Sequence, residues 1–439
     1  MKKNRMNKKI TRAVWLLTML AMLASLCACG AGEKENSTAP AAEETEPPIA
    51  APAPTPHVHS WDNGVCTNCG EACEHHWDGG VCRICGMACP HERHDPKTCC
   101  CSDCLMPVEH SYVNLVCTRC GEGPGFITKL LEFPSAADSG TKRQGKLDNY
   151  HLPSFGGEIV AGARDPKSYT DRNSLDFVVY TPYGYDPETK YNVLILAPGA
   201  GHNAHFWLET ANTFSVTFGR LKGTEMLDGL IEGGCIEPLI VVAAEYYLRG
   251  EPAQSAVWYE QNLRRYILPF VAEHYGTYGS VDEDGTFVPA PEHFALLGAS
   301  FGAMIGWQML TNCADLFSYW GLLSGGFRDD ENMIERINAG LDGTRPIRLI
   351  YAGDGKQAAG SSAYQHRVER IIEGCDGLED GKNILFLASE QTTHSLLTWN
   401  IGLYNCLRIF FRNEYVPDAK SAEAAPAETP RPTAKPSET

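Results

Sequence analysis

Gly298-Ala299-Ser300-Phe301-Gly302 is the stretch of sequence that decides the fold of this chain. A short apolar run at 294–297 precedes it, and a run of helical character at 303–310 follows it. A strand, a tight turn with serine at its tip and then a helix is the context that a G-x-S-x-G nucleophile elbow requires. A side chain at either glycine would collide with the neighbouring strand or helix. The stretch therefore predicts an α/β fold in which Ser300 is a nucleophile.

From about residue 156 to residue 415 the chain alternates short β-rich runs with helical patterns. This alternation predicts a doubly wound sheet, whose ligands bind at the carboxyl ends of its strands. A helical pattern of apolar residues covers 260–275. The expected strands are 177–180, 193–196, 239–243, 294–297, 320–323, 347–351 and 384–387.

Two further side chains are needed beside the serine, because its hydroxyl is a poor nucleophile until an imidazole takes its proton. His394 follows the last expected strand and is the predicted base, whereas His366 lies inside a helical pattern and is the weaker candidate. Asp354 follows the strand before it and is the predicted acid that orients the imidazole. Asp329 and Asp330, after the preceding strand, are the reserve candidates.

The oxyanion formed during acyl transfer needs two preorganised N–H donors. The backbone N–H of Phe301 is the first expected donor, and the second is expected from the loop 197–202, at Ala200. Aromatic residues at 245–247 could stack on a phenolic acid or a sugar, or simply pack against the domain. No organic cofactor is implied.

With these pieces in order, residues 157–412 resemble the esterase D and feruloyl esterase group, carbohydrate esterase family 1. The matching pieces are the oxyanion loop ending at Trp207, the strand entry at 230–243, the Ser300 elbow, and His394 with Trp399 five residues later. The resemblance implies an α/β-hydrolase fold and hydrolysis of acyl esters, often feruloyl or acetyl groups on plant polysaccharide, through a serine acyl-enzyme.

The chain departs from that family at three places. The usual His-Gly of the oxyanion loop is Pro198-Gly199, and the position three residues after the strand-end glycine, where the family carries its acid, holds Lys356. The Gly-Gly before the catalytic histidine and the Asp-Trp after it are also replaced, at 391–393 and 395–396. These departures leave Ser300 and His394 in place, but they leave open which residue is the acid and whether the site is fully active.

The N-terminus has the pattern of an export signal. A basic segment is followed by an apolar run at 13–26, which is too short to span a bilayer comfortably. The sequence Leu26-Cys27-Ala28-Cys29-Gly30 resembles the bacterial lipoprotein cleavage box, with Cys29 as the lipidated residue; an ordinary secretory signal is the alternative. The pattern predicts a protein tethered by lipid to the extracellular face of the bacterial membrane, or secreted if it is not lipidated.

The net charge limits the classes of partner, and the changes in composition along the chain divide it into parts. A net charge of −17 argues against nucleic acid or an anionic membrane surface as the main partner. The predicted parts are a leader at 1–29, a disordered linker at 30–56, a Cys/His-rich region at 57–123, a connector at 124–155, the hydrolase domain at 156–415 and a disordered tail at 416–439.

The Cys/His-rich region holds 12 of the 18 cysteines and repeats the pattern His-x6-Cys-x2-Cys four times. Cys-x2-Cys presents two thiolates to a tetrahedral ion, and a histidine at fixed offset supplies nitrogen. The spacing predicts structural zinc, and a disulfide framework is the alternative in an exported protein. The predicted ligands are His59, Cys66, Cys69 and Cys73 in the first repeat, His75, Cys82, Cys85 and Cys89 in the second, His94, Cys101 and Cys104 in the third, and His110, Cys117 and Cys120 in the fourth.

Taken together, the sequence predicts a lipid-anchored serine esterase that acts on an acylated carbohydrate or another small ester. Three alternatives remain open at this point: a binding protein on a degenerate hydrolase fold, a hydrolase of siderophores or other small esters, and a protein whose working part is the metal array.

Overall fold

The computed structural model describes residues 58–417, except for 79, 96–99, 107, 130–142, 154–156, 163–174, 209–222, 247–250, 328–329 and 342–346. The predicted leader with Cys29, the linker at 30–56, residue 57 and the tail after residue 417 lie outside these residues. The described residues from His59 onward belong to one compact unit. Among the described residues, none of the helices has the length and apolar character needed to cross a membrane.

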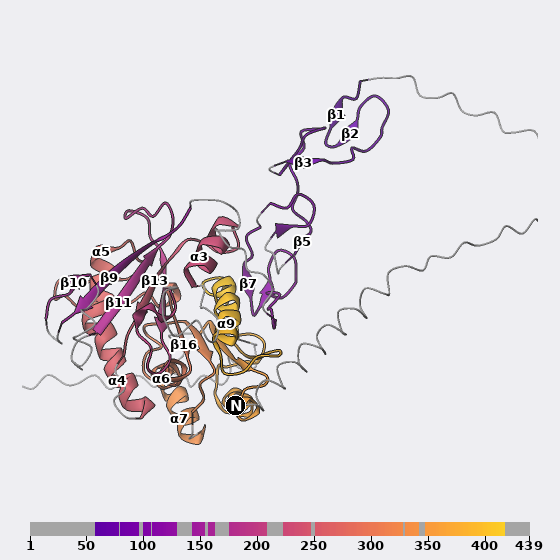
Figure 1. Cartoon of the computed structure of the whole chain (residues 1–439). Coiled ribbons are helices and arrows are strands. Elements are labelled where there is room, and N and C mark those ends of the chain that lie inside the picture. The colour runs from indigo at the N-terminus through magenta and orange to yellow at the C-terminus, as the bar shows by residue number, and fades with distance from the viewer. Residues whose placement is uncertain are drawn as a thin grey trace, which may run out of the picture. The chain divides into compact units, whose positions relative to one another are not determined.

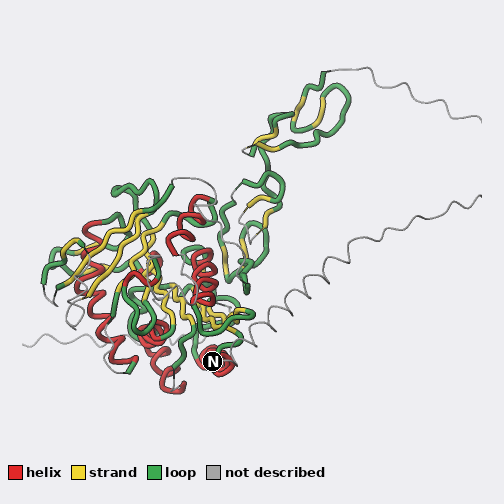
Figure 2. The backbone as a smooth tube through the Cα atoms, viewed as in Figure 1, coloured by secondary structure: helices red, strands yellow, loops and turns green. Residues whose placement is uncertain are grey.

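A nine-stranded mixed sheet organises the hydrolase part of the chain (Figures 1 and 2). Its spatial order is β10-β9-β11-β13-β12-β16-β17-β18-β19. Neighbours from β13 to β19 run parallel, whereas β10, β9, β11 and β13 pair antiparallel. The bounds are β9 Lys146–Leu152, β10 Val160–Ala161, β11 Leu175–Thr181, β12 Asn192–Ala197, β13 Leu239–Ala244, β16 Phe294–Ala299, β17 Tyr319–Leu323, β18 Leu349–Gly355 and β19 Ile384–Ser389.

All seven strands expected from the sequence are present, and β18 begins two residues later and runs four residues further than expected. The strands β9 and β10 were not expected. β9 lies within the predicted connector and pairs along its whole length with β11, so the sheet begins before residue 156. The side chains of β9 are mostly half-buried, so the strand includes polar residues. It therefore lacks the continuous apolar run by which the other strands were recognised.

Helices cover both faces of the sheet, and alternate side chains of each strand enter the two cores. Along β11, for example, Phe177 and Val179 enter one core and Val178 and Tyr180 enter the other. The helices of the first core are α4 Pro252–Asn262, α5 Leu268–His274, α6 Phe301–Leu310, α7 Asp330–Gly340 and α8 Ser361–Gly374; those of the second are α3 Gly223–Glu232 and α9 Leu396–Ile409.

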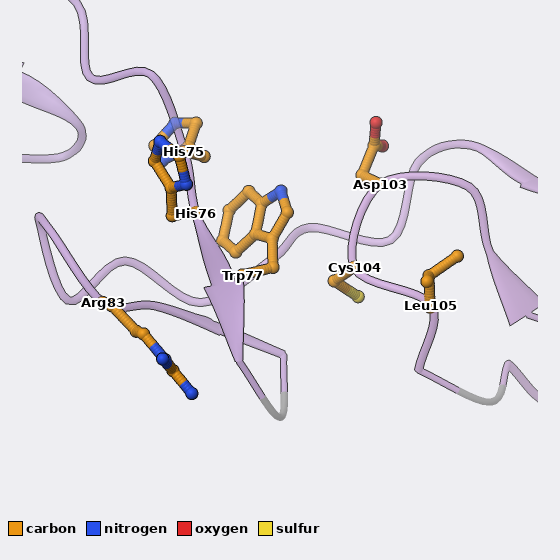
Figure 3. A pocket seen from close by; sticks show the side chains of 7 residues that line it. All are labelled: His75, His76, Trp77, Arg83, Asp103, Cys104 and Leu105. Carbon is orange, nitrogen blue, oxygen red and sulfur yellow. The ribbon is translucent and has the colours of Figure 1, made fainter.

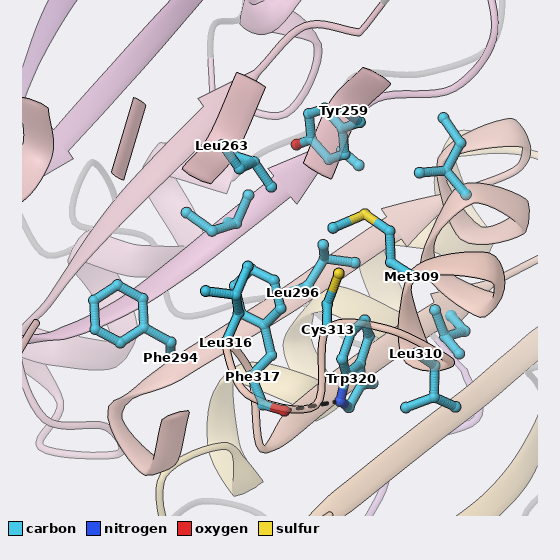
Figure 4. Close-up of a cluster of buried hydrophobic side chains, with 14 of the residues drawn as sticks. Tyr259, Leu263, Phe294, Leu296, Met309, Leu310, Cys313, Leu316, Phe317 and Trp320 are labelled. Carbon is cyan, nitrogen blue, oxygen red and sulfur yellow. Dashed lines mark hydrogen bonds between the residues drawn. The ribbon is translucent and has the colours of Figure 1, made fainter. Parts of the chain in front are cut away.

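The first core is a dense cluster of apolar side chains beneath β16 and α6 (Figure 4). Trp320 is fully buried there, and its indole N–H donates to the carbonyl of Phe317 at 3.1 Å. Burying one side chain such as Leu296 contributes about 2 kcal/mol. This packing fixes the strand and the helix that meet at Ser300.

The helical pattern expected at 260–275 belongs to a longer helical segment. α4 passes into a π-helical turn, η3 Leu263–Ile267, and then into α5. Pro269 stands at the start of α5 and has no N–H to donate, and a widened turn before it accommodates that missing hydrogen bond.

The remaining elements are short. Each Cys/His repeat forms one small hairpin, and β7 of the fourth repeat also pairs with β20 near the C-terminus. The bounds are β1 Trp61–Asp62, β2 Val65–Cys66, β3 Trp77–Asp78, β4 Val81–Cys82, β5 His94–Asp95, β6 Cys100–Cys101, β7 Tyr112–Val113, β8 Val116–Cys117, η2 Ala204–Phe206, β14 Ser280–Val281, β15 Phe287–Val288, η4 Pro291–His293 and β20 Asn413–Glu414.

Candidate active site and metal centres

Ser300 lies at the tip of the turn between β16 and α6, at the carboxyl end of the central parallel strands. Its backbone has φ 55° and ψ −118°, which is unfavourable for a residue with a side chain and is maintained by the structure around it. The Ser300 N–H donates to the carbonyl of Leu323 on β17 at 2.8 Å. A Cβ on Gly298 would lie 2.4 Å from the Gly302 backbone, and one on Gly302 would lie 2.5 Å from the carbonyl oxygen of Pro198. The tight turn therefore requires both glycines.

His394 is brought to the serine across 94 residues of chain. Its Nε2 atom lies 3.0 Å from Ser300 Oγ, which is the distance at which an imidazole takes a hydroxyl proton. The ring is exposed and packs edge-to-face against Trp399, with 5.3 Å between the ring centroids. His394 stands between β19 and α9, so the positions of both elements determine its approach to the serine.

Asp354 lies near the end of β18, buried, but no hydrogen bond joins it to His394 within the described residues. Its Oδ1 atom accepts from Ser324 Oγ at 2.7 Å and from the Gly355 N–H at 2.8 Å. Gly355 in turn lies against the carbonyls of residues 392 and 393, just before His394. Asp354 therefore lies next to the loop that carries His394, but its carboxylate binds Ser324 and Gly355. The reserve Asp329 and the side chain of Asp330 lie outside the described residues, and His366 is on α8.

The loop after β12 lies beside the serine, where the second oxyanion donor was expected. A Cβ built on Gly199 would be 3.7 Å from Ser300 Cβ, so the backbone next to Ala200 passes close to the nucleophile. Two bonds hold this loop: Trp207 Nε1 donates to the carbonyl of Ala197 at 3.0 Å, and the Tyr246 hydroxyl donates to that of Pro198 at 2.9 Å. Phe301, the source of the first expected donor, begins α6 directly after Ser300.

The aromatic loop 245–247 has a structural role in its described part. The Tyr246 ring stacks on Phe301 with 5.8 Å between centroids, and Glu245 accepts the N–H of Asp176 at 3.0 Å. Tyr247 lies outside the described residues. His202, on the oxyanion loop, packs against Phe206, and desolvation by burial lowers its pKa despite contacts with the backbone of the loop. Burial therefore favours the neutral form of this imidazole.

The Cys/His-rich region gathers its ligand atoms into four groups, within each of which the atoms lie less than 4.8 Å apart. Two groups have four members and two have three. They are His59, Cys66 and Cys69; Cys73, His75, Cys82 and Cys85; Cys89, His91, Cys101 and Cys104; and His110, Cys117 and Cys120.

These groups correct the predicted ligand sets in two respects. Cys73 and Cys89 complete the group of the repeat that follows them, rather than that of the repeat before them. In the third repeat the nitrogen comes from His91, not His94. The stretch from His91 to Cys101 is three residues longer than the corresponding stretch from His75 to Cys82 in the second repeat. The prediction assumed the same spacing between histidine and cysteine in every repeat, and in the third repeat that assumption pointed to His94 instead of His91. His94 begins β5, opposite Cys101; its side chain lies outside the described residues.

The distances within the groups fit a tetrahedral metal ion. Cys73 Sγ lies 3.8 Å from Cys82 Sγ, and Cys89 Sγ lies 3.7 Å from Cys101 Sγ. A disulfide would need about 2 Å between sulfurs, whereas Zn–S bonds of about 2.3 Å in a tetrahedron separate them by about 3.8 Å. The four sulfur–nitrogen distances to histidine Nδ1 atoms, between 3.4 and 3.7 Å, are also those of tetrahedron edges.

Backbone amides favour the thiolate of the first cysteine of a Cys-x2-Cys, whereas burial and the neighbouring sulfurs raise the pKa of Cys73 and Cys89. The N–H two residues after the first cysteine of each Cys-x2-Cys points at its sulfur, as from Ile84 to Cys82 at 3.4 Å. Burial acts to raise the Cys82 pKa, but backbone hydrogen bonds and His75 outweigh it and lower the pKa to about 5. For Cys101 the same balance lowers the pKa to about 6. Thiolate is the form that a metal requires.

A shallow hollow separates the second and third groups (Figure 3). One side comes from the second hairpin and the other from the segment after β6. His75 and Cys104, one ligand candidate from each group, face it. The lining is His75, His76, Trp77, Arg83, Asp103, Cys104 and Leu105.

Comparison with known proteins agrees with the geometry around Ser300. Residues 169–367 match the family described as "Putative esterase". The match covers most of the hydrolase part of this chain. The matched residues include Ser300 and Asp354 and end before His394.

Two curated relatives are similar over the same part of the chain. Endo-1,4-beta-xylanase Y of Acetivibrio thermocellus is 29% identical over 264 residues, covering 57% of this chain and 23% of that protein. The endo-1,4-beta-xylanase/feruloyl esterase of Xylanibacter ruminicola is 25% identical over 246 residues, covering 53% and 29%. The chain thus spans about a quarter of each relative. Among solved structures, the feruloyl esterase module of Clostridium thermocellum with sinapinate has a TM-score of 0.49 and 22% identity, over 66% of this chain and 97% of that one.

Proposed function

We propose that this protein is a serine esterase that removes feruloyl-type acyl groups from plant polysaccharide. The observation that carries the proposal is the 3.0 Å contact between His394 Nε2 and Ser300 Oγ at a strained elbow. The relatives support the substrate class, because both are xylanases and one is also named a feruloyl esterase.

The reaction follows from this geometry. His394 Nε2 accepts the Ser300 proton while Oγ forms a bond to the ester carbonyl carbon, whose oxygen becomes an anion. The N–H groups of Phe301 and Ala200 stabilise that anion. The imidazolium then protonates the leaving alcohol oxygen as the carbon–oxygen bond breaks, which leaves the acyl group on Ser300. A water molecule, deprotonated by His394, releases the acid by the reverse sequence.

Asp354 takes a positioning role in this proposal. Its carboxylate binds Ser324 Oγ and the Gly355 N–H, and Gly355 supports the backbone of residues 392–393. The carboxylate thus acts on the loop that carries His394, rather than on the imidazole itself. This arrangement accounts for activity without an acid at the position of Lys356.

The remaining parts of the proposal concern location and metal. The leader and Cys29 support a protein anchored by lipid to the extracellular face of the membrane. The 3.7–3.8 Å sulfur separations support structural zinc in the Cys/His groups, with the two four-membered groups as closed tetrahedral sites. Zinc there would link short hairpins that cannot bury a core of their own.

The direct test is hydrolysis of methyl ferulate and p-nitrophenyl acetate by the purified protein beside its Ser300→Ala variant. Turnover that is lost in the variant is the expected result, with a preference for the ferulate ester. A folded wild-type protein without turnover of either ester would refute the esterase and favour a binding protein on a degenerate hydrolase fold.

A further inference from the structure

The fourth Cys/His group, His110, Cys117 and Cys120, differs from the two four-membered groups in composition. Val108 stands two residues before its histidine, where the second and third repeats have Cys73 and Cys89. His110 and Cys117 are 1% and 2% exposed. Their Nδ1 and Sγ atoms lie 3.5 Å apart, again the length of a tetrahedron edge. Among the residues that the structure describes, the group therefore offers three protein ligands, and a fourth coordination position would remain for another ligand.

The same group differs in its surroundings, because its hairpin is part of the hydrolase fold. β7 pairs in parallel with β20, through N–H bonds of 2.8 Å from Tyr112 to Arg412 and from Asn114 to Glu414. The Leu115 N–H donates to Asn413 Oδ1 at 2.8 Å. The buried side chains of this hairpin share one apolar core with α3 and α9.

The chain that leaves Cys120 continues along α9. The amide of Asn405, on α9, accepts the Ile127 N–H at 3.0 Å and donates to the Ile127 carbonyl at 2.9 Å. Arg408, one turn later, donates to the carbonyls of Pro124 and Gly125 at 3.2 and 3.3 Å. Each contact joins a buried polar side chain of α9 to the backbone of residues 124–127. Residues 124–127 are thereby fixed against the helix that follows His394.

The next residues reach the histidine loop itself. The carbonyl of Thr128 accepts the N–H of Glu390 at 2.8 Å, and Lys129 pairs with the Glu390 carboxylate at 2.9 Å. Glu390 is four residues before His394 and directly follows β19. The segment 124–129 thus contacts the loop before His394 and the helix after it.

We propose that His110, Cys117 and Cys120 form a metal site built into the hydrolase fold, and that this site braces the loop carrying His394. A metal bound there would join the β7–β8 hairpin to Cys120, from which the segment 121–129 begins. That segment in turn bonds to Asn405 on α9 and to Glu390. As a statement about catalysis the inference rests on the proposed esterase function; as a statement about metal and stability it does not.

The second and third groups provide the contrast. Cys89 and Cys101 of the third group form a small cluster with Val108, against which Trp77 of the second hairpin and Cys104 pack, and this cluster is separate from the two hydrolase cores. Loss of metal from the second and third groups should therefore unfold hairpins without disturbing the hydrolase core.

Cys120→Ser and Cys85→Ser form a matched pair for the test. Both residues are the second cysteine of a Cys-x2-Cys, and both are partly exposed. The full protein and each variant are loaded with Zn²⁺ and compared by zinc content, calorimetry and kinetics with methyl ferulate. We expect each variant to lose one zinc. Only Cys120→Ser should lower the melting temperature of the main transition, by on the order of 5 °C, and lower kcat by about tenfold with a smaller change in KM.

Chelation separates the effect of metal from that of the substitution. EDTA should lower the main transition of the wild type and of Cys85→Ser, but leave that of Cys120→Ser unchanged, because its site is already empty. An unchanged wild-type transition in EDTA would overturn the inference even if Cys120→Ser did not fold. So would full zinc content in Cys120→Ser, or an equal loss of stability in Cys85→Ser. A wild type without esterase activity would refute the proposed function and leave the metal and calorimetric results decisive.

Discussion

Gly302 separates the elbow from the oxyanion loop, and Gly302→Ala tests whether their close approach serves catalysis. The new Cβ would lie 2.5 Å from the Pro198 carbonyl oxygen and 2.7 Å from that of Ala197. Both contacts are with backbone, which cannot rotate away as a side chain does. A carbon–oxygen contact needs about 3.2 Å, so the loop must retreat by roughly 0.7 Å.

That displacement is large for an oxyanion hole. A donor placed at about 2.9 Å from the oxyanion would move to about 3.6 Å, beyond useful hydrogen bonding. Loss of one donor lowers kcat by about 10²–10³-fold. Overpacking destabilises the folded protein by about 1–3 kcal/mol. Alanine is more favourable than glycine in a helix by up to about 1 kcal/mol, which offsets part of that loss. We therefore expect a folded protein with a strongly reduced kcat.

Gly306→Ala, one turn further along α6, is the matched control. Its Cβ would meet the ends of two leucine side chains, at 2.5 Å from Leu322 and 3.2 Å from Leu296, and these can repack. The assay measures kcat and KM with methyl ferulate and melting temperature by calorimetry for both variants. A Gly302→Ala protein that keeps kcat within threefold of wild type would refute the reasoning, as would an equal loss of kcat in Gly306→Ala.

Three further expectations concern the catalytic pair, the carboxylate and the shared metal ligands. Ser300→Ala and His394→Ala should each lower kcat by about 10³-fold or more, and the double variant should be no worse than either, since the two act as one unit; additive losses in steady-state kinetics would contradict a shared proton transfer. Asp354→Asn should lower kcat by only about tenfold, because its carboxylate binds Ser324 and Gly355 and not the imidazole. A 10³-fold loss would give Asp354 the role of triad acid. We expect one zinc ion to be missing from Cys73→Ser, from Cys85→Ser and from the double variant in a metal assay, because both sulfurs belong to one group. If the double variant lacked two zinc ions, the two cysteines would belong to separate sites.

The sequence by itself determined the features that depend on local geometry. The G-x-S-x-G stretch specified the elbow, because only glycine fits where Gly298 contacts the first turn of α6. Continuous apolar runs identified seven strands of the sheet, since strands with most of their residues buried carry few polar side chains. The place of His394 after the last of these strands followed from the rule that such sheets bind ligands at the carboxyl ends of their strands.

Only the tertiary structure decided which residues meet across long separations. His91 rather than His94 joins the third Cys/His group, because the length of a hairpin and not a fixed spacing sets which nitrogen reaches the sulfurs. Asp354 binds Ser324 and Gly355, because a carboxylate near several donors takes the ones that the packing of two strands presents. The docking of residues 112–129 on β20, α9 and Glu390 links positions almost 300 residues apart. Such pairings are selected by the folded core as a whole, and no local pattern in the sequence records them.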